Sequence, residues 1–170
     1  LQAVLALGFL RDAEAWDGLA RLASARDPLV SINAARALVQ IDAIKAAGIL
    51  MPLVLSRVDW DIARVAGFLV EARDAFWLHL TRHLPGMPSR ELTRALRLAH
   101  ALRLDLPVAT LRLMLSDAQK PAVVRAALPL VRDAVLHDDV WHALSHTDAG
   151  VREQALLRMA ALATPQDVHR

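Results

Sequence analysis

The chain has 170 residues, of which 55% are hydrophobic and 4% aromatic, and its formal net charge is +2. The absence of cysteine excludes disulfide frameworks and thiolate metal sites. A protein whose main task is to grip phosphate backbones would carry a larger and more clustered positive charge.

The mean hydropathy of +0.32 is high enough for a membrane span to be considered. The longest uncharged apolar run, from Ala46 to Leu55, contains Pro52 and is half as long as the roughly 20 residues that a bilayer requires. No segment has the pattern of a signal peptide. We therefore expect no direct membrane insertion by these residues, and the compartment is left open with the cytoplasm favoured.

An apolar anchor residue recurs along the chain with gaps of 32, 30, 31 and 28 residues. The anchors are Val30, Ile62, Leu92, Val123 and Val151. Another apolar residue follows each anchor after four positions, at Ala34, Ala66, Leu96, Ala127 and Ala155. Because an (i, i+4) pair lies on one face of a helix, the pattern predicts a helix at each anchor.

Each anchor is preceded, three positions earlier, by the residue expected to cap its helix. These residues are Asp27, Asp59, Ser89, Lys120 and Asp148. A lysine cannot accept a hydrogen bond from the first-turn amides, but Pro121 follows Lys120, and proline is favoured at the first helical position.

A second helical segment is expected in each period. Five aspartates precede these segments: Asp12, Asp42, Asp74, Asp105 and Asp133. Each period thus predicts a helix, a short turn and a second helix. The segment from Pro85 to Pro88 falls where the period requires a turn, so we interpret it as a turn between repeats and residues 1–170 as a single domain.

Both ends of the chain have the pattern of interrupted repeats. A shift of 31 residues aligns Ala6-Leu7-Gly8 with Ala37-Leu38-Val39, which places the matching anchor before Leu1. Thr164 to Asp167 has the pattern of a cap followed by proline at the first position of a further helix. We expect a fragment truncated at both ends, whose terminal helices expose apolar faces.

The repeat resembles the HEAT family, most closely its short bacterial form. The resemblance rests on Asp27-Pro28-Leu29-Val30 with Ala34 and Leu38, and on Thr147 to Arg152 with Ala155. It implies an all-α fold, a right-handed α-α superhelix (HEAT/armadillo-like solenoid) of about five helical hairpins. Pro129 inside the first helix of its repeat fits the family as well, and we expect it to bend that helix.

Two histidine pairs have the spacing of adjacent metal ligands on a helix. His79 and His83 form one pair and His142 and His146 the other, with Asp138 or Asp139 as a conceivable third ligand for the later pair. A metal site needs three or four ligands around one centre, so the interpretation preferred here is solvated or partner-facing histidines and no metal or other cofactor.

A stripe of arginines is the best single candidate for contact with a partner. Arg90, Arg94 and Arg97 share one face of the helix expected near Ser89, with His100 and Arg103 further round. Such a ridge could bind a partner's carboxylates or phosphates, or it could simply be a solvated helix face.

The four tryptophans allow two interpretations, base stacking or core packing. Trp77 and Trp141 are 64 residues apart and each precedes a leucine by three positions, which favours packing between hairpins for them and for Trp16 and Trp60.

The carboxylate pairs Asp59 with Asp61 and Asp138 with Asp139 are better explained as caps and helix-dipole partners than as acid-base catalysts.

These patterns favour a non-enzymatic protein-protein interaction or scaffold module. The main alternative is a nucleic-acid-binding solenoid, including one that processes DNA lesions, which would use Arg90, Arg94 and Arg97. A third candidate is an accessory domain of a larger, membrane-anchored bacterial protein.

Overall fold

The computed structural model describes residues 1–84 and 86–162, and within them all regular structure is helical. The expected cap at Thr164 to Asp167 lies outside these residues. The chain divides into two compact units, Leu1–Met87 and Pro88 onward, which are described separately. The division falls between Met87 and Pro88, where the repeat period predicts a turn.

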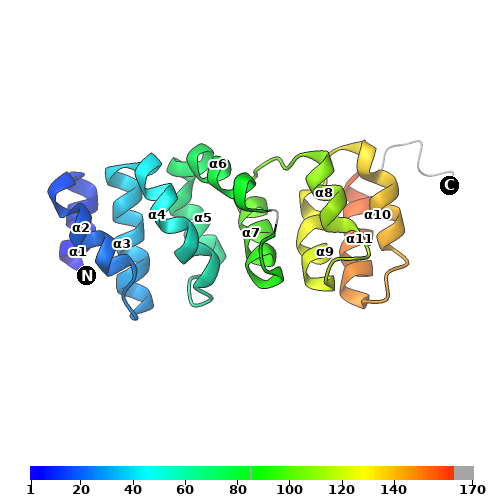
Figure 1. Cartoon of the computed structure of the whole chain (residues 1–170), viewed down its shortest axis with the longest axis horizontal. Helices are drawn as coiled ribbons and strands as arrows, with labels where there is room; N and C mark the ends of the chain where they lie inside the picture. The colour runs from blue at the N-terminus through cyan, green and yellow to red at the C-terminus, as the bar shows by residue number, and fades with distance from the viewer. Residues whose placement is uncertain (85, 163–170) are drawn as a thin grey trace. The chain divides into compact units, whose positions relative to one another are not determined.

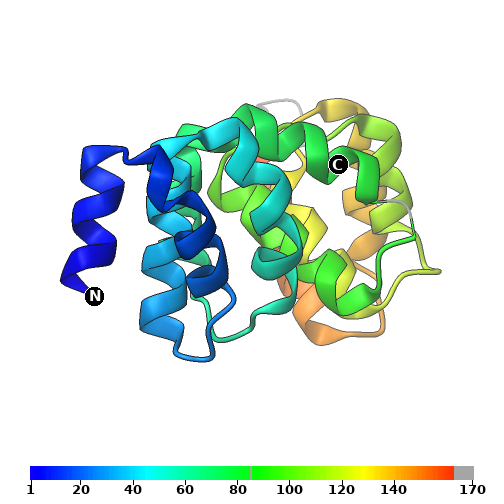
Figure 2. The same cartoon turned by 60° about the vertical axis from the view of Figure 1, so that its left-hand side comes forward.

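The N-terminal unit consists of successive antiparallel helix pairs (Figure 1). Its helices are α1 (Gln2–Leu10), α2 (Trp16–Ala23), α3 (Pro28–Ile41), α4 (Ala43–Ser56), α5 (Ile62–Leu69) and α6 (Arg73–His83), with 3₁₀ turns at Ala13–Ala15 and Val70–Ala72. The central helix α3 packs against α1, α2, α4 and α5, and α4 packs against α6. Figure 2 shows α1 at the outer edge of this unit.

The C-terminal unit repeats the arrangement. Its helices are α7 (Ser89–Ala101), α8 (Val108–Leu115), α9 (Pro121–Ala127), α10 (His137–Ala143) and α11 (Ala149–Leu162), with 3₁₀ turns at Leu128–Leu130 and Ala134–Leu136. Helix α9 packs against α7, α8 and α11, and α10 packs against α8 and α11. No helix in the described part of the chain is long and apolar enough to cross a membrane.

The predicted anchor pattern is confirmed in both units. The anchors lie in α3, α5, α7, α9 and α11, the first helices of successive pairs. The residue four positions after each anchor is at most 7% exposed in every case. The periodic pairs therefore form the continuous apolar side of these helices.

The predicted caps are correct where aspartate directly precedes the helix. The carboxylate of Asp27 accepts a hydrogen bond from the Leu29 amide at 2.8 Å, and that of Asp148 accepts one from the Val151 amide at 3.0 Å. Helix α9 begins at Pro121, and Lys120 before it makes no side-chain cap hydrogen bond.

Two cap predictions are wrong. Helix α5 begins two residues later than Asp59 implies, so its cap is Asp61, which accepts the Arg64 amide at 3.0 Å. Ser89 is already helical. Helix α7 begins with the hydrogen bond that the Leu92 amide donates to the carbonyl of Pro88 at 2.9 Å.

The prediction that Pro129 bends its helix is also wrong. Helix α9 ends at Ala127, and Pro129 lies in the 3₁₀ turn that follows. Proline has no amide hydrogen to donate, and its ring conflicts with the carbonyl four residues earlier, so the α-helix stops instead of bending.

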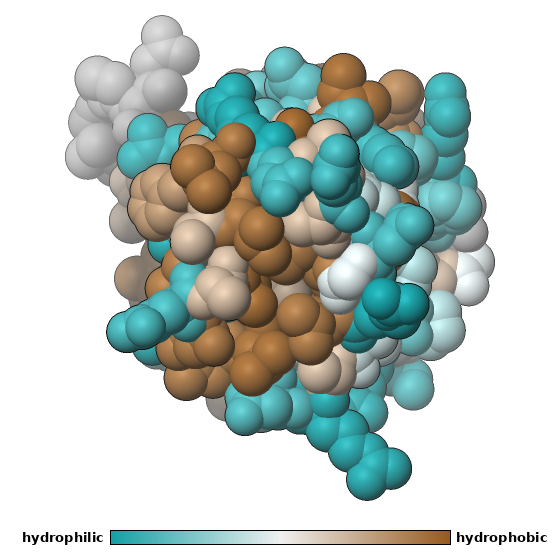
Figure 3. All heavy atoms as spheres, turned by 90° about the vertical axis from the view of Figure 1, so that its left-hand side faces the viewer, coloured by the Kyte–Doolittle hydropathy of each residue, from teal (hydrophilic) through white to brown (hydrophobic). Residues whose placement is uncertain are grey.

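The expected exposure of apolar side chains on the terminal helices is confirmed. On α1, Phe9 is 71% and Leu10 76% exposed, and on α11 Leu156 is 64% exposed. Figure 3 shows a broad apolar area on the side of the molecule where α1 lies.

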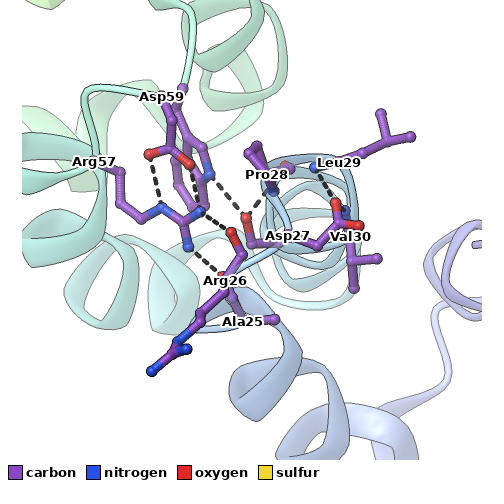
Figure 4. Close-up of polar contacts among 10 residues, drawn as sticks. Ala25, Arg26, Asp27, Pro28, Leu29, Val30, Arg57 and Asp59 are labelled. Atoms are coloured by element: carbon purple, nitrogen blue, oxygen red, sulfur yellow. Dashed lines mark hydrogen bonds and ion pairs between the residues drawn. The ribbon is translucent and has the colours of Figure 1, made fainter.

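A half-buried arginine joins two neighbouring hairpins of the N-terminal unit (Figure 4). Arg57, between α4 and α5, donates hydrogen bonds from its guanidinium to the carbonyl oxygens of Ala25 and Arg26, between α2 and α3. The same guanidinium forms an ion pair with Asp59, with an Nε to Oδ1 distance of 3.0 Å. Hydrogen bonding to Asp59 raises the pKa of Arg57 above its ordinary value, which favours the charged form of the guanidinium. We call this cluster the Arg57 joint.

The Arg57 joint continues into the core through Trp60. This side chain is 1% exposed, and its indole N–H donates to the hydroxyl of Ser31 on α3 at 3.0 Å. The Ser31 hydroxyl in turn donates to the carbonyl of Pro28 at 3.2 Å. The guanidinium of Arg57 lies 5.3 Å from the Trp60 ring centroid, within reach of a cation-π interaction.

Replacing Arg57 should weaken the N-terminal unit markedly. We expect Arg57→Met to lower the free energy of unfolding by about 1.5–3 kcal/mol, because it removes a charged donor from two carbonyls and a carboxylate. Urea denaturation followed by circular dichroism measures the change. Arg26→Met is the matched control, since the Arg26 side chain is exposed, and it should shift stability by less than about 0.5 kcal/mol. Equal effects of the two substitutions would contradict the role of the joint.

The Trp60–Ser31 hydrogen bond can be tested by a double-mutant cycle. Ser31→Ala leaves a buried indole N–H unpaired, which should cost about 1–3 kcal/mol. Trp60→Phe removes the unpaired donor. The double variant should therefore be more stable than the sum of the single effects by at least about 0.5 kcal/mol. Additive effects in denaturant titrations would show that the bond contributes nothing.

Candidate functional site

A groove lies between the first helices of two neighbouring pairs in the N-terminal unit. This groove 1 has a volume of about 480 Å³ and is lined by Leu29, Ile32, Asn33 and Arg36 of α3 and by Arg64, Gly67 and Phe68 of α5. Ile32 and Phe68 are largely buried and form its apolar floor, whereas Leu29 is 50% exposed at its edge.

The two arginines of groove 1 carry charge that the fold does not neutralise. Arg36 and Arg64 are both exposed, and neither guanidinium has an ion-pair or hydrogen-bond partner within the described ranges. No carboxylate lines the groove. The groove therefore combines two free guanidiniums with an apolar floor.

Glycine keeps groove 1 open on its α5 side. A Cβ placed on Gly67 would meet no atom within 4 Å, so the helix presents a gap there. Glycine in a helix interior costs roughly 0.5–1 kcal/mol relative to alanine. At Gly8 a Cβ would lie 2.9 Å from the Cα of Ala37, so close packing requires glycine there. No such close contact requires glycine at Gly67.

Groove 2 occupies the corresponding position in the C-terminal unit. It has a volume of about 340 Å³. It is lined by Arg97 and His100 of α7, by Arg125 and Ala126 of α9, by Pro129 of the 3₁₀ turn after α9, and by Gln154 of α11. Arg97 has no partner among the described residues. Arg125 lies near Asp148, but its Nε is 4.0 Å from the carboxylate, at the limit of an ion pair.

A third groove contains an arginine whose charge is neutralised. It is lined by residues of the C-terminal unit that include Asp105, Leu111, Arg132 and Asp133. Here the guanidinium of Arg132 is paired with Asp105 at 2.5 Å. Among the described residues, arginine thus occurs as a neutralised residue in this groove and without an ion-pair partner in groove 1 and at Arg97 of groove 2.

Of the predicted stripe, only Arg97 lines groove 2. Arg90 and Arg94 lie on the same helix outside its lining, and Arg94 is half-buried with a partner of its own. The structure instead brings Arg97 together with His100 and Arg125. A role of Arg90, Arg94 and Arg97 in binding a partner stays a prediction.

The sequence contains a signal for the groove arginines that the stripe interpretation missed. Arg64, Arg94 and Arg125 each lie two positions after an anchor, in three consecutive repeats. The equivalent positions in the other repeats are Ile32 and Glu153. Comparing one position across repeats, instead of one helix face at a time, would have identified two of the lining arginines.

The two histidines of each pair have different surroundings. The ring of His142 lies 3.2 Å from both carboxylate oxygens of Asp117, whereas Nδ1 of His146 accepts the Asp148 amide at 2.9 Å. His79 packs against Gly48 of α4 and His83 is exposed. Across residues 1–84 and 86–162, no group of three or more such side chains is arranged to hold a metal ion.

The carboxylate pairs have structural roles. Asp61 caps α5 and Asp59 belongs to the Arg57 joint. Asp138 and Asp139 lie in the first turn of α10, where the helix dipole favours negative charge, and Asp139 also pairs with Arg112 at 3.3 Å.

Three of the four tryptophans pack as expected. Trp16 and Trp60 are buried and Trp77 is half-buried. The prediction is wrong for Trp141, which is 55% exposed. Helix α10 is short and buries Val140 and Ala143, so the adjacent position of Trp141 falls on the solvent side.

Grooves 1 and 2 both present guanidinium groups, and groove 1 also has an apolar floor. A guanidinium is permanently charged and offers several hydrogen-bond donors in a planar arrangement that matches a carboxylate. An apolar floor beside it accepts an aliphatic or aromatic side chain. No family model, no curated protein and no solved structure matches this chain.

Proposed function

We propose that the chain is a non-enzymatic binding module that holds acidic, partly apolar segments of a partner protein in grooves 1 and 2. The observation that carries the proposal is the coincidence, in groove 1, of two unneutralised arginines with the apolar floor of Ile32 and Phe68. A segment with a carboxylate next to a leucine or an aromatic residue would satisfy both features.

The proposed architecture is a right-handed α-α superhelix of HEAT-like hairpins. It is supported by the regular anchors, which continue from Ile62 to Leu92 with a gap of 30 residues. It is also supported by grooves 1 and 2, each of which is lined by first helices of neighbouring pairs. Repeated grooves of one kind suit a partner that makes several similar contacts.

The groove chemistry favours a protein partner over nucleic acid. A phosphate backbone is bound chiefly by many cationic contacts, and its affinity rises with their number. The net charge here is only +2, and the floor of groove 1 is apolar. Carboxylate-bearing peptides use both the charge and the apolar surface, whereas a phosphate backbone uses the charge alone.

Peptide selection tests the proposal. A random peptide library displayed on phage is selected against the chain, and we expect enrichment of peptides with Asp or Glu next to Leu, Phe or Trp. Fluorescence anisotropy of a labelled enriched peptide then gives the affinity. Arg36→Glu combined with Arg64→Glu should weaken binding by about tenfold or more, because charge-assisted hydrogen bonds are lost.

The matched control is Arg26→Glu combined with Arg82→Glu. This variant changes the net charge equally at two exposed arginines outside the grooves, so it should leave the affinity almost unchanged. Enriched peptides without acidic residues would refute the proposal. Salt-sensitive binding of duplex DNA that disappears when Arg90, Arg94 and Arg97 are all replaced by Glu would favour the nucleic-acid function instead.

A substitution at Gly67 should block groove 1 without disturbing the fold. The side chain introduced by Gly67→Leu would extend into the open gap and raise helix propensity, so stability should be kept or increased while peptide binding falls. Gly18→Leu is the control, because a Cβ on Gly18 in α2 also meets open space, away from the groove. If Gly67→Leu binds the selected peptide as tightly as the parent chain, groove 1 is not its site.

A further inference from the structure

Groove 2 is lined by polar side chains that the fold leaves without hydrogen-bond partners. Within the described residues, Arg97, His100 and Gln154 form no side-chain hydrogen bond and no ion pair. Arg125 forms no hydrogen bond there either, and its Nε lies 4.0 Å from an Asp148 oxygen that already accepts the Val151 amide. No carboxylate lines the groove. Groove 2 therefore presents several donors together.

The arginines of grooves 1 and 2 are equivalent in the repeat pattern. Each arginine of groove 1 is followed 61 positions later by one of groove 2, Arg36 by Arg97 and Arg64 by Arg125. The same offset puts Pro129 of groove 2 in the place of the aromatic Phe68 of groove 1. Groove 2 also adds an imidazole and a carboxamide. It thus combines the same pair of guanidiniums with a more polar lining.

The donors of groove 2 come from three helices. Arg97 and His100 lie one turn apart on α7, Arg125 lies on α9 and Gln154 on α11. A carboxylate has two coplanar oxygens, which a single guanidinium can satisfy. A phosphate monoester has three acceptor oxygens and carries about −1.5 to −2 charges at pH 7. The additional oxygen and charge match a second guanidinium and donors that approach from other helices.

Gly150 provides the space in which the side chain of Arg125 lies. A Cβ on Gly150 would be 2.8 Å from Nη1 and 2.9 Å from Cδ of Arg125. A larger residue in this first turn of α11 would therefore displace the arginine side chain. The side chain is 45% exposed, so its guanidinium is both packed on one side and accessible to a ligand.

We propose that groove 2 binds a phosphorylated serine or threonine side chain of the partner protein. This inference rests on the proposed function, because it names the ligand that groove 2 takes from an acidic segment. The groove volume of about 340 Å³ lies within the roughly 300–1,000 Å³ of ligand sites. An unmodified hydroxyl has no charge to attract the two guanidiniums, so phosphorylation of the partner controls binding at groove 2.

Two other phosphate ligands fit groove 2 less well. A phosphotyrosine brings an aromatic ring, and groove 2 lacks the aromatic floor that Phe68 gives groove 1. A nucleic-acid phosphodiester carries one negative charge and two free oxygens, so it leaves donors of the groove unpaired.

Peptide pools with one fixed central residue test the proposal. Three fluorescein-labelled pools of random sequence differ only in a central phosphoserine, serine or glutamate, and their binding to the chain is followed by fluorescence anisotropy. We expect the phosphoserine pool to bind at least about tenfold more tightly than the glutamate pool. Equal binding of these two pools would overturn the proposal. So would displacement of the phosphoserine pool by oligothymidylate as readily as by free phosphoserine peptide.

Charge reversal identifies the groove responsible. Arg97→Glu combined with Arg125→Glu should remove the preference for phosphoserine over serine. The matched control, Arg36→Glu combined with Arg64→Glu, changes the net charge equally in groove 1 and should keep that preference. The preference is a ratio within each variant, so a failure of acidic-peptide binding at groove 1 is distinguishable from a failure of groove 2. A groove 2 variant that retains the preference would refute the site.

Gly150→Ala tests the position of Arg125 without changing any charge. The added methyl group displaces the arginine, so the affinity for the phosphoserine pool should fall by about threefold or more as charge-assisted hydrogen bonds weaken. Alanine favours the helix, so thermal unfolding should show a fold at least as stable as that of the parent chain. Gly18→Ala is the control, because its Cβ meets open space in α2, and it should bind like the parent chain. An unchanged affinity of Gly150→Ala would contradict the role of Arg125.

Discussion

The guanidinium of Arg57 connects two turns that belong to different hairpins, and the fold depends on connections of this kind. A single hairpin of short helices cannot bury both of its sides, so each hairpin needs its neighbour. In the N-terminal unit the apolar contact around Trp60 is combined with charged hydrogen bonds to the carbonyls of Ala25 and Arg26. Those bonds fix the register of α5 against α3, and groove 1 lies between these two helices.

The predictable part of the structure is the part determined by periodicity. The anchor pairs indicate which face of each first helix is buried, because burial of that face is repeated at a constant spacing. Cap positions are less certain, since Asp59 and Asp61 flank Trp60 and either could begin a helix. The choice is decided by Arg57, whose ion pair with Asp59 leaves Asp61 to cap α5. That partner cannot be recognised from local sequence.

Which residues share a groove was not predictable, because these residues come from different helices. Arg36 lines groove 1 from α3 and Arg64 from α5, and nothing in either helix alone indicates that they share a surface. Nor does sequence distinguish an arginine that is neutralised, such as Arg132, from one that is not, such as Arg97. The exposure of Trp141 has a similar origin, since the packing of α10 against α8 and α11 decides which of its positions face the core.

Five polar contacts between hairpins in the described part of the chain each span about one repeat. Arg57 to Ala25, Trp60 to Ser31, Arg112 to Asp139, Arg132 to Asp105 and His142 to Asp117 cover 32, 29, 27, 27 and 25 residues. Each hairpin thus depends on its immediate neighbours and not on distant parts of the chain. The proposed solenoid architecture implies that duplication or deletion of one complete hairpin would recreate the same kind of junction, so that a longer or shorter chain could still fold.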